Sequence, residues 1–497
     1  MEMEFEKRVI GYQNRLLRDC QSQELTQDLK LPEGMPDVGT VLGCWGQCVL
    51  RTKEWRSESI GVSGGVIAWV LYLPEGGGLP QCMETWLPYQ MKWNIPKTPH
   101  DGSICAAPCL YSADARSLSS RKLMLRINLG VLVEAWCGDE VQISTPGEIP
   151  EDVQVLKHTY PMRILKEVGE RPFDLEETLE MSTAEPKPER ILRSSLQPQI
   201  LESKLMGDKA VFRGVGIVHI LYSAEDGQIY SRDFDVPFSQ YSELEGEYTA
   251  DGDASVSVAV TGLEVDLDPE KGIEVKVGLL CQYKVFEDIQ LEMVEDAYSN
   301  RRTVELQIQQ FKLQNILDSS YSLVHASGEI GADVRRCVDI SFMVRQPQLS
   351  QGEDLVDVDM SGTFRILYYD PEGELACTSA EWNDTLSVPT DSESRVEMML
   401  VPMGRVQANS GDGSAHGDVS METVVIGGTP IQIVAGMNLG QLAEPDPKRP
   451  SLILRRTEDR SLWDIAKITG STVDLIRSAN SLEGEPSGSQ ILLIPVP

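Results

Sequence analysis

The chain of 497 residues has no long apolar run. No stretch approaches the roughly 20 consecutive apolar residues that a membrane-spanning helix needs. Its first 20 residues alternate charged and apolar side chains, and they lack the continuous apolar core of a secretory signal peptide. We therefore expect a protein without membrane insertion that stays in the cytosol of the cell that makes it.

Positive charge is also scarce. The sequence has 44 Lys and Arg residues against 77 Asp and Glu residues, which gives a formal net charge of −33. A negative field of this size repels nucleic acids and anionic lipid surfaces. We therefore expect no nucleic-acid partner. Keeping a protein soluble is enough to explain the charge itself.

The common catalytic motifs are absent or lack their structural context. The sequence has no GxxxxGK phosphate loop, no HExxH and no GxGxxG after a strand. Its GxSxG match at Gly61 to Gly65 is followed by a strand-like segment and not by the helix that a nucleophile elbow requires. Its five histidines are scattered among different predicted domains, at His100, His158, His219, His325 and His416. Carboxylates without a partner base or metal are no evidence of catalysis. We expect a protein that is not an enzyme and binds no cofactor.

The ten cysteines include two CxxxC spacings, Cys44 with Cys48 and Cys105 with Cys109. No nearby histidine completes a familiar zinc pattern. Cys44 and Cys48 lie in a segment with strand character, where residues i and i+4 share one face. We expect free thiols in a reducing compartment and no metal site.

A threefold repeat covers most of the chain. Each copy has an apolar segment that ends in Leu-Tyr, at Leu71, Leu221 and Leu367. A second element lies 34 residues upstream of each leucine, and it contains Asp37, Lys187 and Asp333, respectively. The same offset three times indicates a repeated structural unit.

Each repeat is rich in segments with the alternating pattern of β-strands, separated by turn residues. We expect a mainly β fold of three tandem sandwich-like or barrel-like units, followed by a small α+β module. Helix is expected elsewhere only at Glu4 to Cys20. The predicted divisions are a helix at 1–25, units at 26–148, 175–297 and 302–435, a proline-rich linker at 436–450, and the module at 451–497.

The last 47 residues predict a βααβ order. Two apolar runs begin at Leu452 and Ile491, and two short amphipathic segments lie between them. Ser461 and Ser471 each precede an aspartate by three residues, which is the spacing of a capping box. Gly470 and Asn480 are expected to end the two helices.

This module resembles a LysM domain. The resemblance rests on a closing Leu-Ile-Pro run and on the residues Thr457, Ser461-Leu462-Trp463-Asp464-Ile465-Ala466, Thr472-Val473, Leu475, Asn480 and Leu482. It implies binding of N-acetylglucosamine glycans through the loop before the first helix and the loop before the last strand. The chain departs from the family in both loops, with Asp459-Arg460 in the first and Ser489 in the second. A protein ligand is therefore favoured over a glycan.

Six residues of the module are candidates for partner binding: Asp459, Arg460, Trp463, Ile476, Arg477 and Asn480. Trp463 is expected to belong to the core, because its neighbours form an apolar stripe. Arg455, Arg456 and Arg460 form a basic cluster in the first loop region. The cluster is either a solvated surface or a source of donors for an acidic partner.

Tandem units with the Pro-Asp-Val and Leu-Tyr elements before a LysM-like module resemble the SPOCS domain family of clostridial spore-coat proteins. The resemblance implies spore morphogenesis in the mother-cell cytosol. The module would then dock on the spore-coat scaffold ATPase at the forespore surface and promote coat encasement. Two alternatives remain: a protein that binds peptidoglycan or chitin-type glycans, and a scaffold whose units self-associate through sheet edges.

Overall fold

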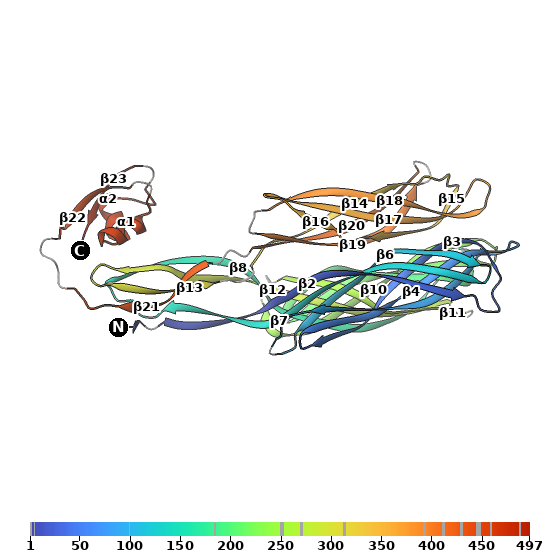
Figure 1. The fold of residues 1–497 in the computed structure, drawn as a ribbon, viewed down its shortest axis with the longest axis horizontal. Helices are drawn as coiled ribbons and strands as arrows, with labels where there is room; N and C mark the ends of the chain where they lie inside the picture. Colours follow the sequence, from blue (N-terminus) through green and yellow to red (C-terminus); the bar gives the residue numbers. More distant parts are fainter. Residues whose placement is uncertain are drawn as a thin grey trace.

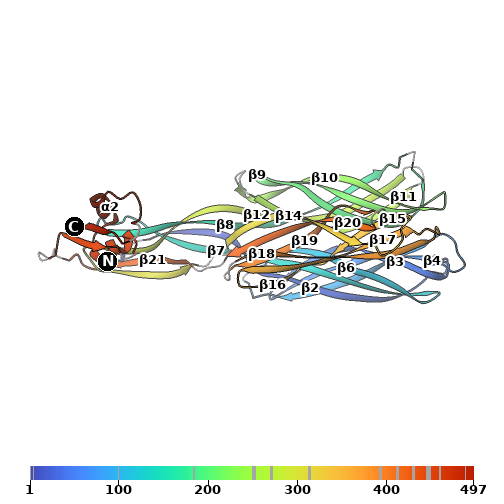
Figure 2. The same cartoon turned by 90° about the horizontal axis from the view of Figure 1, so that it is seen from above.

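The computed structural model describes residues 2–3, 5–98, 100–182, 185–248, 253–268, 272–311, 315–390, 394–409, 413–427, 431–443, 449–457, 460–486 and 489–497. The described residues form 23 strands and two short helices, and both helices lie in the C-terminal module. The prediction of a mainly β protein is confirmed. Figures 1 and 2 show an elongated molecule with a broad body, a narrow stalk and the module at the far end of the stalk.

The first unit is a sandwich of two three-stranded antiparallel sheets, ordered β2-β7-β6 and β3-β4-β5. Its strands are β2 (Phe5–Lys30), β3 (Val38–Arg56), β4 (Ser59–Pro74), β5 (Gln81–Asn94), β6 (Ser103–Ser119) and β7 (Lys122–Pro146). Both sheets bury alternate side chains in one core, for example Val66 and Tyr72 from β4, and Leu125 and Ile127 from β7. The alternation follows from the two-residue period of a strand.

The helix predicted for residues 1–25, with its centre at Glu4 to Cys20, is wrong. This segment belongs to β2, which pairs with β7 from Phe5 opposite Pro146 to Lys30 opposite Lys122. Its Arg, Gln and Leu residues favour a helix in isolation. Pairing along the whole of β7 overrides that preference, and the first unit therefore begins with β2.

The second unit has the sheets β11-β12-β8 and β10-β9. Its strands are β8 (Val153–Leu179), β9 (Pro188–Ala224), β10 (Ile229–Tyr248), β11 (Asp253–Asp268) and β12 (Gly272–Ser299). The two ends of the long β9 lie side by side, because the N–H group of Glu225 donates to the carbonyl of Lys187. The N–H group of Glu75 donates to the carbonyl of Asp37 in the same way in the first unit.

The third unit combines the sheet β14-β20-β19 with a four-stranded sheet in which β17 pairs with β15, β16 and β18. Its sandwich strands are β14 (Asn315–Glu329), β15 (Arg336–Val344), β16 (Gln348–Gln351), β17 (Leu355–Tyr369), β18 (Leu375–Pro389), β19 (Arg395–Asn409) and β20 (Ser414–Gly427). The unit lies against the other two in the body (Figure 1). Its core is centred on Phe364, which is fully buried.

The repeated sequence elements are neighbours in space. The ladder between β3 and β4 has a bulge at Leu42, and the ladder between β15 and β17 has one at Val338, five residues after Asp37 and Asp333, respectively. One central hydrophobic cluster joins residues from these positions in all three units: Leu42, Leu71, Leu192, Leu221, Val338 and Leu367. The repeat signature therefore builds the contact between the units.

The stalk consists of strand pairs that continue beyond the sandwiches. These are the ends of β2 with β7 and of β8 with β12, and the pair β13 (Val304–Phe311) with β21 (Ile431–Leu439), to which β1 (Glu2–Met3) adds. Each unit contributes to one shared apolar core, through Ile10 and Ile143, Met162 and Leu291, and Ile433, respectively. The stalk is thus a joint product of the three units.

The C-terminal module contains β22 (Leu452–Arg456), α1 (Leu462–Thr469), α2 (Val473–Asn480) and β23 (Ile491–Pro495). The two strands form an antiparallel sheet with Leu454 opposite Leu493. The predicted βααβ order is therefore present. Of the linker predicted at 436–450, residues 436–439 belong to β21, and residues 444–448 lie outside the described residues.

Candidate functional site

The helices of the module begin and end at local sequence signals. The hydroxyl of Ser461 accepts a hydrogen bond from the N–H group of Asp464 and caps α1, as predicted. Gly470 ends α1 in the left-handed conformation, with a φ of 67°, which glycine adopts without strain. These caps satisfy backbone groups that short helices leave unpaired.

The caps predicted for α2 are each displaced by one residue. The N-cap is Thr472, whose hydroxyl accepts from the N–H group of Leu475. Ser471 is fully buried, and its hydroxyl donates to the carbonyl of Pro495. The C-cap is Ser481, with a φ of 52°. The side chain of Asn480 contacts β23, so Asn480 remains part of α2 and Ser481 becomes the C-cap.

The module packs on the end of β12 in the stalk. The ring of Trp463 makes an edge contact with the ring of Tyr298 at 4.9 Å between centroids, and its Nε1 donates to Asp296 at 2.8 Å. Lys467 pairs with the same aspartate at 2.6 Å. The hydroxyl of Tyr298 donates to the carbonyl of Ser471 at 3.0 Å. Tyr298 thus belongs to the hydrophobic core of the module.

Burial and the charge of Asp296 raise the pKa of Tyr298 to about 12. The phenol therefore stays neutral and keeps its proton for the hydrogen bond to the module. Arg449 adds contacts from the linker, because its guanidinium donates to the carbonyls of Asn300 and Gly470 at 3.2 Å each. The module is held to the end of β12 by an aromatic pair, an ion pair and several hydrogen bonds.

The structure divides the six predicted binding residues into separate roles. Asp459 lies outside the described residues. Arg460 is exposed, and its backbone N–H donates to the carbonyl of Thr457. Ile476 is fully buried in the module core. Trp463 is half-buried against the stalk.

Arg477 is exposed on α2, 3.9 Å from Glu485. Asn480 is a structural clamp: its Nδ2 donates to the carbonyl of Leu493 at 2.6 Å, and its Oδ1 accepts from the N–H group of the same residue at 2.8 Å. Arg460 and Arg477 therefore present charge to solvent, while Ile476 and Asn480 hold the fold.

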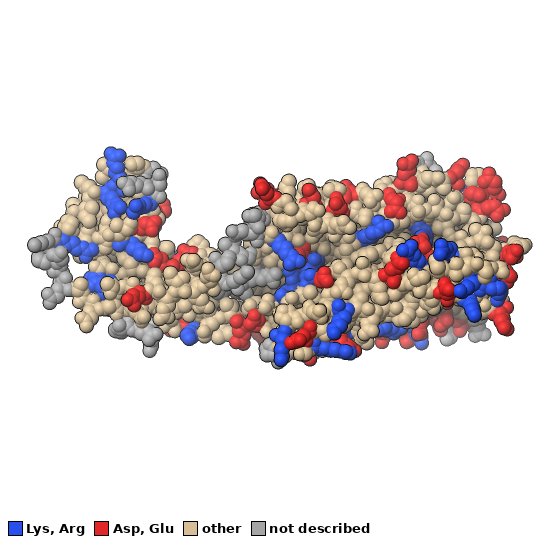
Figure 3. Space-filling view, in the orientation of Figure 1, with Lys and Arg blue, Asp and Glu red and all other residues tan. Residues whose placement is uncertain are grey.

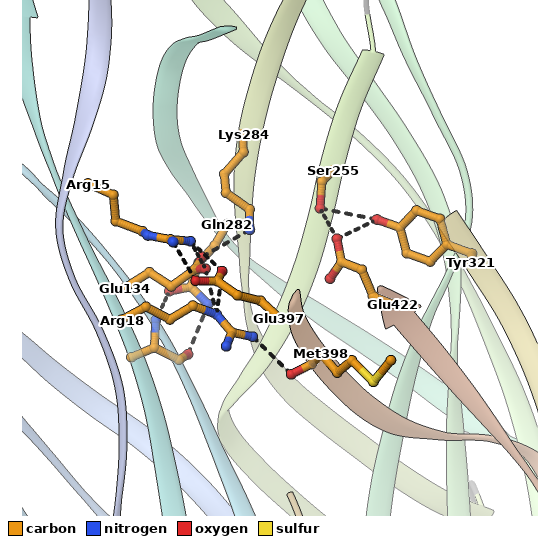
Figure 4. Close-up of polar contacts among 11 residues, drawn as sticks. Arg15, Arg18, Glu134, Ser255, Gln282, Lys284, Tyr321, Glu397, Met398 and Glu422 are labelled. Atoms are coloured by element: carbon orange, nitrogen blue, oxygen red, sulfur yellow. Dashed lines mark hydrogen bonds and ion pairs between the residues drawn. The ribbon is translucent and has the colours of Figure 1, made fainter. Parts of the chain in front are cut away.

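A second group of polar residues lies where the three units meet, and the sequence analysis did not identify it (Figure 4). Arg15 of β2 donates to Glu397 of β19 at 2.6 Å, and Lys284 of β12 donates to Glu134 of β7 at 2.9 Å. Each pair joins two different units. We call the contact surface of the three units the central seam.

Burial alone would raise the pKa of Glu134, but Lys284, Arg18 and Arg15 together lower it to about 2. The carboxylate is therefore ionised and fixed among cations. The available signal in the sequence is that Glu134 and Lys284 are charged residues within mostly apolar stretches, and that they are 150 residues apart, as are Leu71 and Leu221.

Side chains also cover the edges of the sheets at the central seam. Gln282 of β12 accepts from the N–H group of Ala106 at 2.8 Å and donates to the carbonyl of the same residue at 3.0 Å. Arg18 donates to the carbonyl of Met398 at 2.9 Å, and Gln197 donates to the carbonyl of Pro402 at 2.6 Å. Such contacts use backbone groups that would otherwise pair with another chain.

The most deeply buried cluster of charged residues at the central seam joins the second and third units. Arg193 donates to Asp339 at 2.8 Å, and the side chains of both are almost completely buried. His219 lies between two carboxylates, with Nδ1 2.6 Å from Asp233 and Nε2 2.7 Å from Asp339. A carboxylate close to each ring nitrogen favours the protonated, charged imidazole.

The cysteines make no disulfide. Burial raises the pKa of Cys44 to about 12 and that of Cys105 to about 11, so both thiols stay protonated. Within the part of the chain that the structure describes, no group of three or more His, Cys, Asp or Glu side chains is arranged for a metal ion. Among the described helices, none is long and apolar enough to cross a membrane.

Comparison with known proteins gives one match. Residues 187–268 match the family model described as SipL, SPOCS domain. This segment begins at Lys187, the residue at which the repeat signature of the second unit was placed. No curated protein matches the chain, and no solved structure does. The second unit is therefore similar to a SPOCS domain, which indicates a sporulation-related role in protein interaction.

Proposed function

We propose that this chain is a non-enzymatic spore morphogenesis protein that binds the spore-coat scaffold ATPase through its C-terminal module. In this proposal, the ATPase lies at the forespore surface, in the mother-cell cytosol, and the complex promotes encasement of the spore by its coat. The similarity of residues 187–268 to the SPOCS domain of SipL supports the connection with sporulation.

The observation that carries the proposal is the position of the module. It lies at the end of the stalk, away from the body, and is held there by Trp463 and Tyr298 (Figure 1). In the three units, by contrast, the residues of the repeat signature and the buried charged residues contact one another. A body with a small module at the end of a stalk is suited to presenting that module to another molecule.

Fluorescence microscopy of sporulating host cells tests the proposal. A fluorescent fusion of the full chain should surround the forespore together with the scaffold ATPase. A fusion that lacks residues 451–497 should remain diffuse in the mother cell, while its thermal unfolding shows that the body still folds. Encirclement by the shortened fusion would contradict the proposal.

A sedimentation experiment with purified peptidoglycan separates the glycan alternative. We expect the full chain to remain in the supernatant. Sedimentation that chitin oligomers reverse would replace the proposed function with glycan binding.

A further inference from the structure

The two strands of the module have one covered and one open face. Ile453, Leu492 and Ile494 point toward the helices and belong to the module core. Residues of β22 and β23 at alternate positions point the other way. Leu452, Leu454 and Ile491 lie on this outer face and are 52%, 70% and 62% exposed, respectively.

Leu454 is the neighbour of both Leu452 and Ile491, which lie toward opposite ends of the strand pair. The strand register places Leu454 opposite Leu493, and Arg456 opposite Ile491. Leu452 is two residues before Leu454 and so lies next to it on the same face. Single exposed apolar residues are ordinary on protein surfaces, but a contiguous group marks an interaction site. We call this surface the outer sheet face.

The charge of the outer sheet face differs from that of the chain. Arg456 shares the outer sheet face with Leu454, and the described strands β22 and β23 contain no carboxylate, whereas the whole chain carries a net charge of −33. Figure 3 shows Lys and Arg side chains over the module, and many Asp and Glu side chains at the far end of the body. A basic and apolar surface attracts an acidic partner and steers it away from the acidic body.

We propose that the outer sheet face binds an acidic segment of another protein. Aliphatic side chains of that segment contact Leu454 and Ile491, and its carboxylates pair with Arg456. The inference rests on the proposed function, because it assigns the surface through which the module docks. It differs from sugar binding in LysM-like modules, which uses the loops before α1 and β23.

Matched substitutions in the full-length chain test the assignment, with the purified scaffold ATPase as the probe. Leu454→Gln and Arg456→Glu should each weaken binding at least about tenfold, as expected for residues central to an interface. Ile468→Gln and Arg213→Glu are the controls. Ile468 is 54% exposed on α1, across the module core from the outer sheet face. The side chain of Arg213 is 65% exposed on β9 of the body.

The controls should change the affinity less than about twofold, since residues outside an interface contribute little to binding. Binding by Arg456→Glu should also lose the dependence on salt that the parent shows. Thermal unfolding of each variant verifies that the module remains folded. If the control variants lose as much affinity as the sheet variants, or if none loses any, the outer sheet face is not the docking surface.

The test separates this inference from the proposed function. If the parent does not bind the ATPase, or if removing residues 451–497 leaves binding intact, both fail. If the removal abolishes binding while Leu454→Gln and Arg456→Glu bind as the parent does, only the outer sheet face is excluded. A dimer of the parent in light scattering that Leu454→Gln dissociates would assign the face to a second copy, which also overturns the inference.

Discussion

The central seam and the contact between module and stalk join parts of the same chain in different ways. At the central seam, Arg193 and Asp339 are almost completely buried, and leucines from all three units form one cluster. At the stalk tip, the module rests mainly on Trp463 and Tyr298, and it leaves Leu454 largely exposed. At the central seam, the charged and apolar side chains are buried between the units. At the stalk tip, the module keeps an apolar surface exposed.

This difference explains why a repeat signature need not mark a binding site. The leucines that recur in each unit pack against one another at the central seam, so their recurrence reflects assembly of the body. The module has no equivalent elsewhere among the described residues. The part of the chain that occurs once is therefore the better candidate for recognition.

Removing the charge of Asp339 should break the central seam most severely. Asp339→Asn leaves Arg193 and His219 buried without their carboxylate, and loss of one partner from a buried pair costs about 3–5 kcal/mol. Urea unfolding should show this loss. Asp418→Asn, at an exposed His–Asp pair, should change the free energy of unfolding by less than about 0.5 kcal/mol. Equal effects at the two sites would contradict the structural role of Asp339.

Shortening one signature leucine should cost almost as much. Leu221 is 1% exposed in the central cluster, so Leu221→Ala should lower the free energy of unfolding by about 2–5 kcal/mol. Leu355→Ala is the control, because Leu355 is 46% exposed on β17. If unfolding midpoints of the two variants coincide, the repeat signature does not hold the units together.

The charge of His219 should make the central seam sensitive to pH. Burial lowers the pKa of His219, but the carboxylates of Asp339 and Asp233 raise it above the ordinary value of 6.5 in the balance. Its stabilisation is therefore complete below pH 6.5, and it is lost as the pH rises through the raised pKa.

The carboxylate of Asp339 sets the acid limit. Burial raises its pKa, but Arg193 and His219 lower it to about 2, so its stabilisation is present above its ordinary pKa of 3.8 and is lost as the pH falls toward 2. Thermal unfolding should show the strongest contribution of Asp339 and His219 to stability at pH values between these limits. His219→Gln should remove the fall on the alkaline side, and His325→Gln, at an exposed histidine, should retain it.

The stalk contact should respond least. Trp463→Phe keeps a ring against Tyr298 but removes the hydrogen bond to Asp296, which should cost about 1–2 kcal/mol at this contact alone. Hydrogen exchange should become faster in the module and remain unchanged in the body. Trp86→Phe, on an exposed tryptophan of the first unit, should have no such effect. Faster exchange throughout the body would show that the module is not a separate element.

The sequence predicted the local features of the structure well. The repeat, the mainly β fold, the order of elements in the module and the caps at Ser461 and Gly470 follow from spacing and turn residues. The prediction of a helix at Glu4 to Cys20 was wrong, because pairing with a strand 112 to 141 residues away overrides local propensity. The predicted caps of α2 were each wrong by one residue, because the burial of Ser471 and the hydrogen bonds of Asn480 depend on β23.

The candidate surface was only partly predictable. Arg456 was noticed as part of a basic cluster, but the alternation that exposes Leu454 and Ile491 becomes informative only when the covered face of the sheet is known. Trp463 was expected in the core, and its contact with Tyr298 requires the stalk to end beside the module. The pairing of Arg193 with Asp339 depends on how units pack, which no local pattern encodes.

A binding titration with purified proteins tests most directly the claim that recognition belongs to the module. The full chain and a chain that lacks residues 451–497 are each titrated against the scaffold ATPase by calorimetry. The account predicts saturable binding by the full chain and none by the shortened chain, with both bodies unfolding at the same temperature. Equal affinities for the two chains would place recognition in the three units and contradict the account.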